Sequence, residues 1–204
     1  MVEKEKKLLL HACCAPCLSH VYETLKDSFD IHVFFYNPNI APRDEYQRRL
    51  DELSRFSAER NFTLSEGDYD LKIWTAAVRP YRYYGERSER CWNCYRVRLE
   101  ASFIAARRLG MDMVGTVLSI SPHKDAEKIN EIGSALATEY SIPFLEANFK
   151  KNDGFKKSLE LSKKYDFYRQ EYCGCIYSKL ERERDPRWIE KITSFQEKLE
   201  KNKS

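Results

Sequence analysis

The chain has 204 residues, 42% hydrophobic and 33% charged, and this composition excludes a wholly disordered protein because a sizeable core can be buried. Its 35 basic and 32 acidic side chains nearly cancel to a net charge of +3, so the protein as a whole is not a strongly basic nucleic-acid binder. No stretch approaches 18 consecutive apolar residues, and the apolar run near the charged start is too short for a signal peptide. We therefore expect a cytoplasmic protein without a membrane partner.

Two strand-like runs open the chain, KLLLHAC at 7–13 and IHVFFYN at 31–37, with a helix-spaced segment between them. This order predicts a βαβ unit with parallel strands and a right-handed crossover. A long helix is predicted over 43–61, directly after Pro42, and a short strand follows in FTLSEGDYD at 62–70.

The rest of the chain continues the alternation of helices and strands. In chain order we predict a helix over 71–78, a helix over 91–109 closed by Gly110, a strand within 111–120, a helix within 121–140, a strand within 142–149, and helices from about 154 onward. The pattern predicts a doubly wound α/β fold with a parallel sheet of about five strands. We divide the chain into an α/β domain over 1–150 and a helical C-terminal extension over 151–204 that packs on it.

Several chemically distinctive loops follow the predicted strands. CCAPC follows the first strand, YNPN the second, and LSISPHKD spans the end of the fourth. Ligands bind beyond the carboxyl ends of the strands in open parallel sheets, so we expect these loops to face one crevice.

Seven cysteines fall into three groups, and in a cytoplasmic chain such groups indicate metal ligands or redox centres rather than disulfides. They are Cys13, Cys14 and Cys17, then Cys91 and Cys94, then Cys173 and Cys175. Zinc would use four thiolates, and a [4Fe–4S] cluster would also use four, so either leaves three sulfurs over. Those three could hold a second metal, or single cysteines could belong to the core.

Five segments together resemble the cobalamin-independent epoxyqueuosine reductases, a family of tRNA-modification enzymes. In order they are HACCAPC, FFYNPNIAPRDEYQRR, RCWNCYRVRLE, LSISPHKD and FYRQEYCGCIYS, which span about residues 7–180. The resemblance implies an oxidoreductase that converts epoxyqueuosine to queuosine at the tRNA wobble position. It also implies a [4Fe–4S] cluster with an additional iron beside it, and a fold akin to the PP-loop nucleotide hydrolases. CCAPC occupies the place of a PP-loop's phosphate-binding loop, which argues against ATP use in the reaction.

The seven cysteines are expected to divide between these two metals. Our hypothesis assigns the cluster to four of them (Cys14, Cys91, Cys94, Cys173) and the second iron to three (Cys13, Cys17, Cys175). Candidate proton donors in the same crevice are His123, Asp125 and Tyr95, although His123 and Asp125 could equally belong to a helix cap. An external electron donor is also required.

The segment 78–98 carries six arginines against two glutamates, with aromatic residues between them. Arginines pair with phosphates and aromatic rings stack on unpaired bases, so the segment favours contact with RNA. The candidate RNA-binding residues are Arg79, Arg82, Tyr83, Tyr84, Arg87 and Arg96. Two other functions remain open: an ATP-dependent tRNA thiolation enzyme of the PP-loop type, and a zinc-stabilised RNA-binding module.

Overall fold

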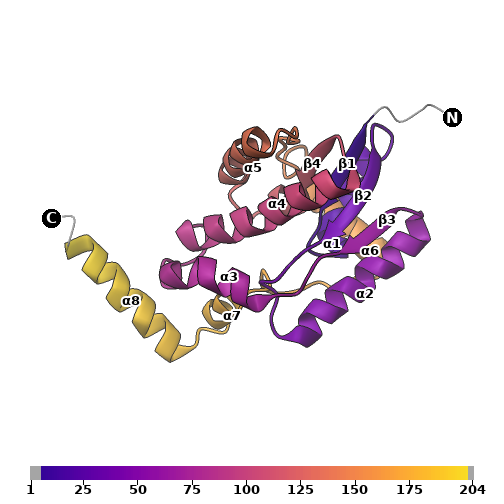
Figure 1. Ribbon diagram of the computed structural model, residues 1–204. Coiled ribbons are helices and arrows are strands. Elements are labelled where there is room, and N and C mark those ends of the chain that lie inside the picture. The colour runs from indigo at the N-terminus through magenta and orange to yellow at the C-terminus, as the bar shows by residue number, and fades with distance from the viewer. Residues whose placement is uncertain (1–5, 202–204) are drawn as a thin grey trace.

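The computed structural model describes residues 6–201 and contains a parallel β-sheet with helices on both faces (Figure 1). Its strands are β1 (Lys7–His11), β2 (Asp30–Phe35), β3 (Thr63–Glu66) and β4 (Met113–Thr116). Their order is β3-β2-β1-β4, with every neighbouring pair parallel. The chain builds outward from β1 to β3 and then returns to the other side of β1, which creates a topological switch point between β1 and β4.

Helices cover both faces of this sheet, with α4 and α5 on one face and α1, α2 and α6 on the other (Figure 1). Within the described residues the helices are α1 (Ala15–Leu25), α2 (Arg43–Arg60), α3 (Leu71–Val78), η1 (Arg79–Tyr81), α4 (Glu89–Leu109), η2 (Val117–Ile120), α5 (Ala126–Tyr140), α6 (Gly154–Lys164), α7 (Ile176–Arg182) and α8 (Pro186–Lys201). Helix α4 ends at Gly110 in the left-handed conformation, so the predicted cap is confirmed. Among residues 6–201, no helix combines the length and apolar character needed to cross a membrane.

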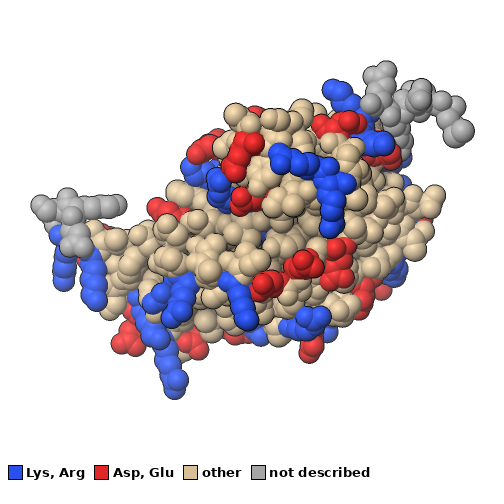
Figure 2. All heavy atoms as spheres, in the orientation of Figure 1, with Lys and Arg blue, Asp and Glu red and all other residues tan. Residues whose placement is uncertain are grey.

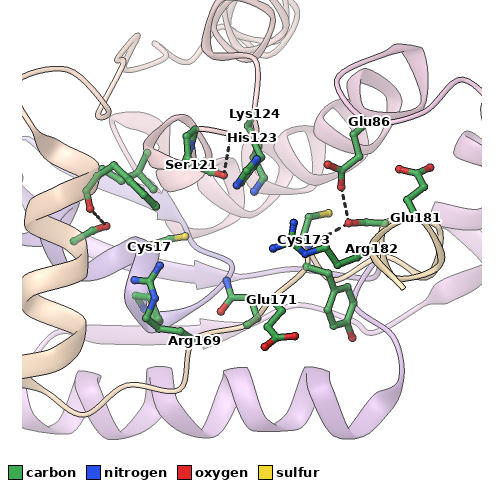
Figure 3. A pocket seen from close by; sticks show the side chains of 18 residues that line it. Cys17, Glu86, Ser121, His123, Lys124, Arg169, Glu171, Cys173, Glu181 and Arg182 are labelled. Carbon is green, nitrogen blue, oxygen red and sulfur yellow. Dashed lines mark hydrogen bonds between the residues drawn. The ribbon is translucent and has the colours of Figure 1, made fainter. Parts of the chain in front are cut away.

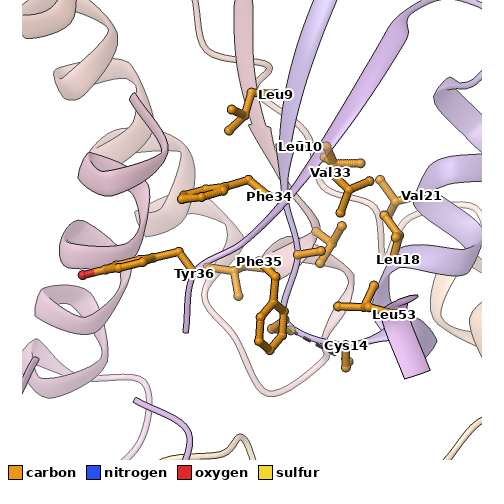
Figure 4. Packing of buried hydrophobic residues seen from close by; sticks show 14 of the residues in the cluster. Leu9, Leu10, Cys14, Leu18, Val21, Val33, Phe34, Phe35, Tyr36 and Leu53 are labelled. Carbon is orange, nitrogen blue, oxygen red and sulfur yellow. Dashed lines mark hydrogen bonds between the residues drawn. The ribbon is translucent and has the colours of Figure 1, made fainter. Parts of the chain in front are cut away.

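The centre of the core is the apolar run of β1. Leu8, Leu9 and Leu10 have no exposed surface, and Val33 and Phe35 of β2 are equally buried beside them (Figure 4). The run is continuous rather than alternating because helices cover both faces of the sheet. This packing fixes the end of β1, and with it the position of the residues that follow.

The fold class is as predicted, but the sheet has four strands instead of five. The segment predicted as a fifth strand forms only an isolated parallel bridge between Val114 and Phe144. Pro143 has no N–H to donate, so a regular ladder cannot continue through it. The fourth strand is also shorter than predicted, because Val117–Ile120 turn into a 3₁₀-helix whose Leu118 N–H donates to Thr116 Oγ1 at 3.2 Å.

Replacing Leu10 with alanine should lower the free energy of unfolding by about 2–5 kcal/mol, because the substitution leaves a cavity in the most buried strand. The measurement is urea unfolding followed by circular dichroism. Ile104→Ala is the control, since Ile104 on α4 is 56% exposed and its truncation should change stability by less than about 0.5 kcal/mol. Equal losses in the two variants would contradict the placement of β1 at the centre of the core.

Candidate metal centre

The first group of cysteines lies in the connection between β1 and α1 and in the first turn of α1. Cys14 is the extended N-cap residue of α1, and Pro16 occupies its first turn, where a missing N–H costs no hydrogen bond. The sulfurs of Cys13, Cys14 and Cys17 lie within 4.8 Å of one another, and those of Cys13 and Cys14 are 3.9 Å apart. The positive end of the helix dipole favours thiolates at this position. These three residues, the sulfur triad, could hold one metal ion.

The other four cysteines form a second group, the sulfur quartet. Cys91 and Cys94 lie on the first turns of α4, three residues apart and therefore on one face. Cys175 is the N-cap of α7, and Cys173 precedes it by two residues. All four line one small enclosed cavity of about 30 Å³ together with Trp74 and Tyr95. None of the seven cysteines forms a disulfide.

Long-range contacts bring the segment of Cys173 and Cys175 to this place. The buried Arg49 of α2 donates to the carbonyl oxygens of Cys173 at 3.2 Å and Tyr172 at 3.3 Å. Gly174 lies in the left-handed region, with φ of 118°, and a Cβ there would approach Ile40 Cγ1 to 2.9 Å. The turn therefore requires glycine, which lets the chain pass close against Ile40.

A larger cavity of about 420 Å³ opens beside both groups (Figure 3). Cys17 of the triad and Cys173 of the quartet both line it, although 156 residues separate them in the chain. Lys124 and His123 line the large and the small cavity alike. A molecule in the large cavity would therefore reach both sulfur groups.

The thiols compete for protons with one another. Hydrogen bonds from Cys14 and Cys17 hold the pKa of Cys13 well below its usual range, and the bond with Cys13 raises the pKa of Cys14 to about 11. In the quartet a hydrogen bond from Cys175 lowers the pKa of Cys173, while burial raises that of Cys91 to about 12. Bringing all the sulfurs into the thiolate form therefore needs added positive charge, which a metal supplies.

Four buried cations surround the sulfur groups, and within residues 6–201 two of them form no ion pair with a carboxylate. Arg49 pairs with Glu45 at 2.6 Å, and Arg90 pairs with Glu181. By contrast, Arg98 donates to Asn37 Oδ1 at 2.6 Å, and its Nε has no partner. Lys124 is the fourth, with 8% exposure.

Burial alone would lower the pKa values of Arg98 and Lys124, but nearby thiolates, led by Cys94 for Arg98 and by Cys13 for Lys124, hold both above their ordinary values. An unpaired buried charge is costly, so these two cations call for a buried anion. A metal group held by several thiolates carries such negative charge. The all-sulfur donor set and the unpaired cations therefore fit a thiolate-bound iron group.

Hydrogen bonds to the sulfurs orient them. Gln170 Nε2 donates to Cys14 Sγ at 3.1 Å, and the Ser178 N–H donates to Cys175 Sγ at 3.3 Å. The Ser178 hydroxyl accepts from the Cys173 N–H at 3.3 Å and donates to Glu86 Oε1 at 2.5 Å. Such contacts fix ligand geometry around a metal.

The candidate proton donors lie in different surroundings. Tyr95 is buried against the quartet, and burial raises the pKa of its phenol. His123 is exposed to the large cavity. Asp125 lines neither cavity, and its Oδ1 accepts from the Lys128 N–H at 3.1 Å as the N-cap of α5. Burial lowers the pKa of His11 to about 3, and its ring bridges Thr116 Oγ1 and the Tyr36 carbonyl as a neutral core group.

The candidate RNA-binding residues have different contacts within the protein. Tyr83 and Tyr84 pack on Phe195 of α8, with ring centroids 6.0 and 4.9 Å apart. Arg82 stacks on Tyr83 at 4.5 Å, and Arg79 accepts from Arg82 through its carbonyl oxygen. The two remaining candidates differ: Arg96 pairs with Glu139 at 3.2 Å, whereas Arg87 forms no ion pair among the described residues.

Sequence reasoning missed Arg98, Lys124 and Gln170 around the sulfurs. Arg98 follows Cys94 by four residues on α4, so helical spacing alone already placed it on the same face. Lys124 lies between His123 and Asp125, but its burial depends on packing that no local pattern reports. For Gln170, 156 residues from Cys14, the sequence offers no signal.

Comparisons with known proteins agree over most of the chain. Residues 8–181 match the family described as epoxyqueuosine reductase QueH. The enzyme of that name from Acinetobacter baylyi is 41% identical over 174 residues, which are 84% of this chain and 80% of that protein. The Streptococcus pyogenes enzyme is 39% identical, covering 86% and 72%. The Thermotoga maritima enzyme is 36% identical, covering 86% and 91%.

Two solved structures share the fold at low sequence identity. A U34-tRNA thiolase NcsA from Methanococcus maripaludis, solved with its [4Fe–4S] cluster, has a TM-score of 0.53 and 13% identity, covering 98% of this chain and 69% of that chain. A predicted subunit of tRNA methyltransferase from Methanocaldococcus jannaschii has a TM-score of 0.51 and 14% identity, covering 76% and 74%. The chain therefore shares its fold with these two proteins, and the sequence matches assign it to the epoxyqueuosine reductase QueH family of oxidoreductases.

Proposed function

We propose that the protein removes the epoxide oxygen of epoxyqueuosine at the wobble position of tRNA and thereby forms queuosine. The observation that carries the proposal is the meeting of two sulfur groups at one cavity through Cys17 and Cys173. A volume of about 420 Å³ lies in the range of small-molecule sites and suits a single modified nucleoside. A base that reacts there must leave the anticodon stack, which costs a few kcal/mol.

The spacing of the sulfurs supports a division between two metals. Thiolates on one tetrahedral ion with bonds of about 2.3 Å lie roughly 3.8 Å apart, close to the 3.9 Å between Cys13 and Cys14. The triad therefore suits the additional iron. The quartet suits a [4Fe–4S] cluster, whose four thiolates bind four different irons and lie farther apart. The partition expected from the sequence placed Cys14 on the cluster and Cys175 on the second iron. This proposal instead places Cys175 on the cluster and Cys14 on the additional iron.

Deoxygenation of the epoxide consumes two electrons and two protons and yields an alkene and water. The iron groups would supply the electrons and a Lewis-acid site for the oxygen, with no need for cobalamin. The protein's own groups bind and orient the nucleoside and deliver protons. We assign proton delivery to His123 in the large cavity and Tyr95 beside the quartet. The Asp125 carboxylate already caps α5 and is the weakest of the three proposed donors.

The buried cations would stabilise the reduced state of the centre. Arg98 and Lys124 have no carboxylate to neutralise them, so their charges act on the sulfurs and on any group bound there. Added electrons make an iron–sulfur group more negative, and a fixed neighbouring cation favours that change. Electrons would come from an external donor, and the proposed location is the cytoplasm.

Two other functions receive less support. A tRNA thiolation enzyme would need a phosphate-binding loop after β1, where this chain has Cys13, Cys14 and Pro16. A zinc-stabilised RNA-binding module would use four sulfurs and leave the triad without a role. The proposed reductase uses both sulfur groups.

Metal content should follow the proposed partition. Cys175→Ser should remove most acid-labile sulfide and the broad absorption near 400 nm, because it loses a cluster ligand. Cys14→Ser should retain the sulfide and lose about one iron per chain. The measurement is iron, sulfide and absorbance on protein purified without oxygen. If instead Cys14→Ser removed the sulfide and Cys175→Ser lost only about one iron, the partition predicted from the sequence would be correct.

The reaction itself is testable with tRNA that carries epoxyqueuosine. Metal-loaded protein with a chemical reductant should convert it to queuosine, detected by mass spectrometry of the digested nucleosides. Cys17→Ser should lower the rate at least tenfold, because Cys17 faces the reaction cavity. A colourless, zinc-only protein that leaves the epoxide intact after attempted cluster reconstitution would overturn the proposal.

Arg98→Gln should lower the reduction potential of the bound centre, because a buried cation near the sulfurs is removed. Arg98→Lys keeps the charge and should stay closer to the unchanged protein. The measurement is a spectroelectrochemical titration of the visible absorption, which does not depend on substrate. Equal potentials in all three proteins would contradict the proposed role of Arg98.

A further inference from the structure

Four cations lie in or next to the large cavity, and we name them the rim cations: Arg87, Lys150, Arg169 and Arg182. Arg169 and Arg182 line the cavity and face it from opposite sides (Figure 3). Lys150 Nζ donates at 2.8 Å to the carbonyl oxygen of Lys124, another lining residue. Arg87 directly follows the lining residue Glu86.

The rim cations are not ion-paired within the part of the chain that the structure describes, although the charge of Asp125 also acts on Lys150. Among the described residues, none of the four forms a salt bridge with an aspartate or glutamate. Arg169 donates only to the neutral Ser162 hydroxyl, at 3.3 Å. Burial and then the nearby charge of Arg87 lower the pKa of Lys150, so two like charges are held close together. An anion placed between them would relieve this repulsion.

The inside of the same cavity is different in character. Carboxylates of Glu86, Glu171 and Glu181 line it, together with the sulfurs of Cys17 and Cys173. Glu181 is paired with Arg90, but Glu86 and Glu171 form no salt bridge among residues 6–201. Epoxyqueuosine has a secondary amine between its base and its epoxide ring, and a protonated amine suits this acidic interior. The cavity is thus lined by carboxylates as well as by cations.

We propose that the rim cations bind the RNA phosphates on either side of an everted nucleotide whose base occupies the cavity. The assignment of that base rests on the proposed function, whereas the phosphate contacts rest on the rim cations themselves. Arginine and lysine contacts to phosphates position an RNA without reading its sequence. The cavity has room for about one nucleoside, so the two flanking phosphates would lie outside it, within reach of cations that line the cavity or lie beside it.

This surface differs from the one predicted from the sequence. Tyr83 and Tyr84 pack on α8, and Arg96 is engaged with Glu139. Of the six residues predicted to bind RNA, Arg87 belongs to the rim. The other three rim cations lie far from the segment 78–98 in the chain, 63, 82 and 95 residues after Arg87. Lys150 lies between α5 and α6, Arg169 lies between α6 and α7, and Arg182 is the last residue of α7.

The test measures binding of an unmodified anticodon stem-loop RNA by fluorescence anisotropy at several salt concentrations. The double variants Arg87→Gln/Lys150→Gln and Arg169→Gln/Arg182→Gln should each bind at least tenfold more weakly than the unchanged protein. Losing two phosphate contacts should also reduce the slope of log affinity against log salt by about 1.4, at roughly 0.7 per contact to single-stranded RNA. Circular dichroism and iron content check that each variant is folded and loaded.

The control is Lys6→Gln/Arg108→Gln, which removes two exposed charges far from the cavity, at the start of β1 and the end of α4. Its affinity should stay within twofold of the unchanged protein. Rim variants that bind like this control would overturn the proposal, as would a blunt RNA duplex that binds as tightly as the stem-loop. The RNA lacks an epoxide, so its binding does not depend on the reductase reaction. If the rim variants lose RNA binding but the unchanged protein has no reductase activity, the rim site stands and the proposed function is rejected. If the protein is active on tRNA but the rim variants bind the RNA as tightly as the unchanged protein, the proposed function stands and the rim site is rejected.

Discussion

The burial of sulfur beside unpaired positive charge is the constraint on which the rest of this structure depends. Four of the seven cysteines are buried and three are half-buried, and among the described residues Arg98 and Lys124 beside them form no ion pair with a carboxylate. Neither the cations nor the thiolates would be stable there alone, because charge is poorly solvated in a protein interior. Together with a metal they neutralise one another. The thiolates, the metal that they would hold and the two buried cations are therefore electrostatically coupled. Removing any one of them would change the protonation of the remaining thiols and cations.

The topology explains why this unit forms where it does. Because β4 returns to pair with β1, the loops after both strands meet at one edge of the sheet. The triad follows β1, while Lys124 follows β4 and η2. Helix α4 brings Cys91 and Cys94 to the same edge. Arg49 on α2 holds the C-terminal segment that contains Cys173 there by donating a hydrogen bond to the Cys173 carbonyl oxygen. This edge of the sheet therefore carries the sulfur groups.

The large cavity is lined by sulfurs, carboxylates and cations. A nucleotide with a cationic amine on its modified base carries groups of both signs that these side chains would complement. On the face of the molecule that Figure 2 shows, basic and acidic side chains are interspersed. The four rim cations, by contrast, lie in or next to one cavity. Such a local distribution lets a protein with a net charge of only +3 bind a polyanion at one place.

The sequence by itself determined the fold class and the end of α4 at Gly110, since these follow from local periodicity and turn chemistry. It also predicted three groups of cysteines as metal ligands from motif spacing alone. It also identified the family through five ordered segments. Only the tertiary structure decided which sulfurs stand together, because Cys17 and Cys173 approach through contacts across 156 residues. The same holds for the buried Lys124 and for the strand reduced to one bridge at Phe144. Burial and proximity are properties of the packed chain, and no local pattern encodes them.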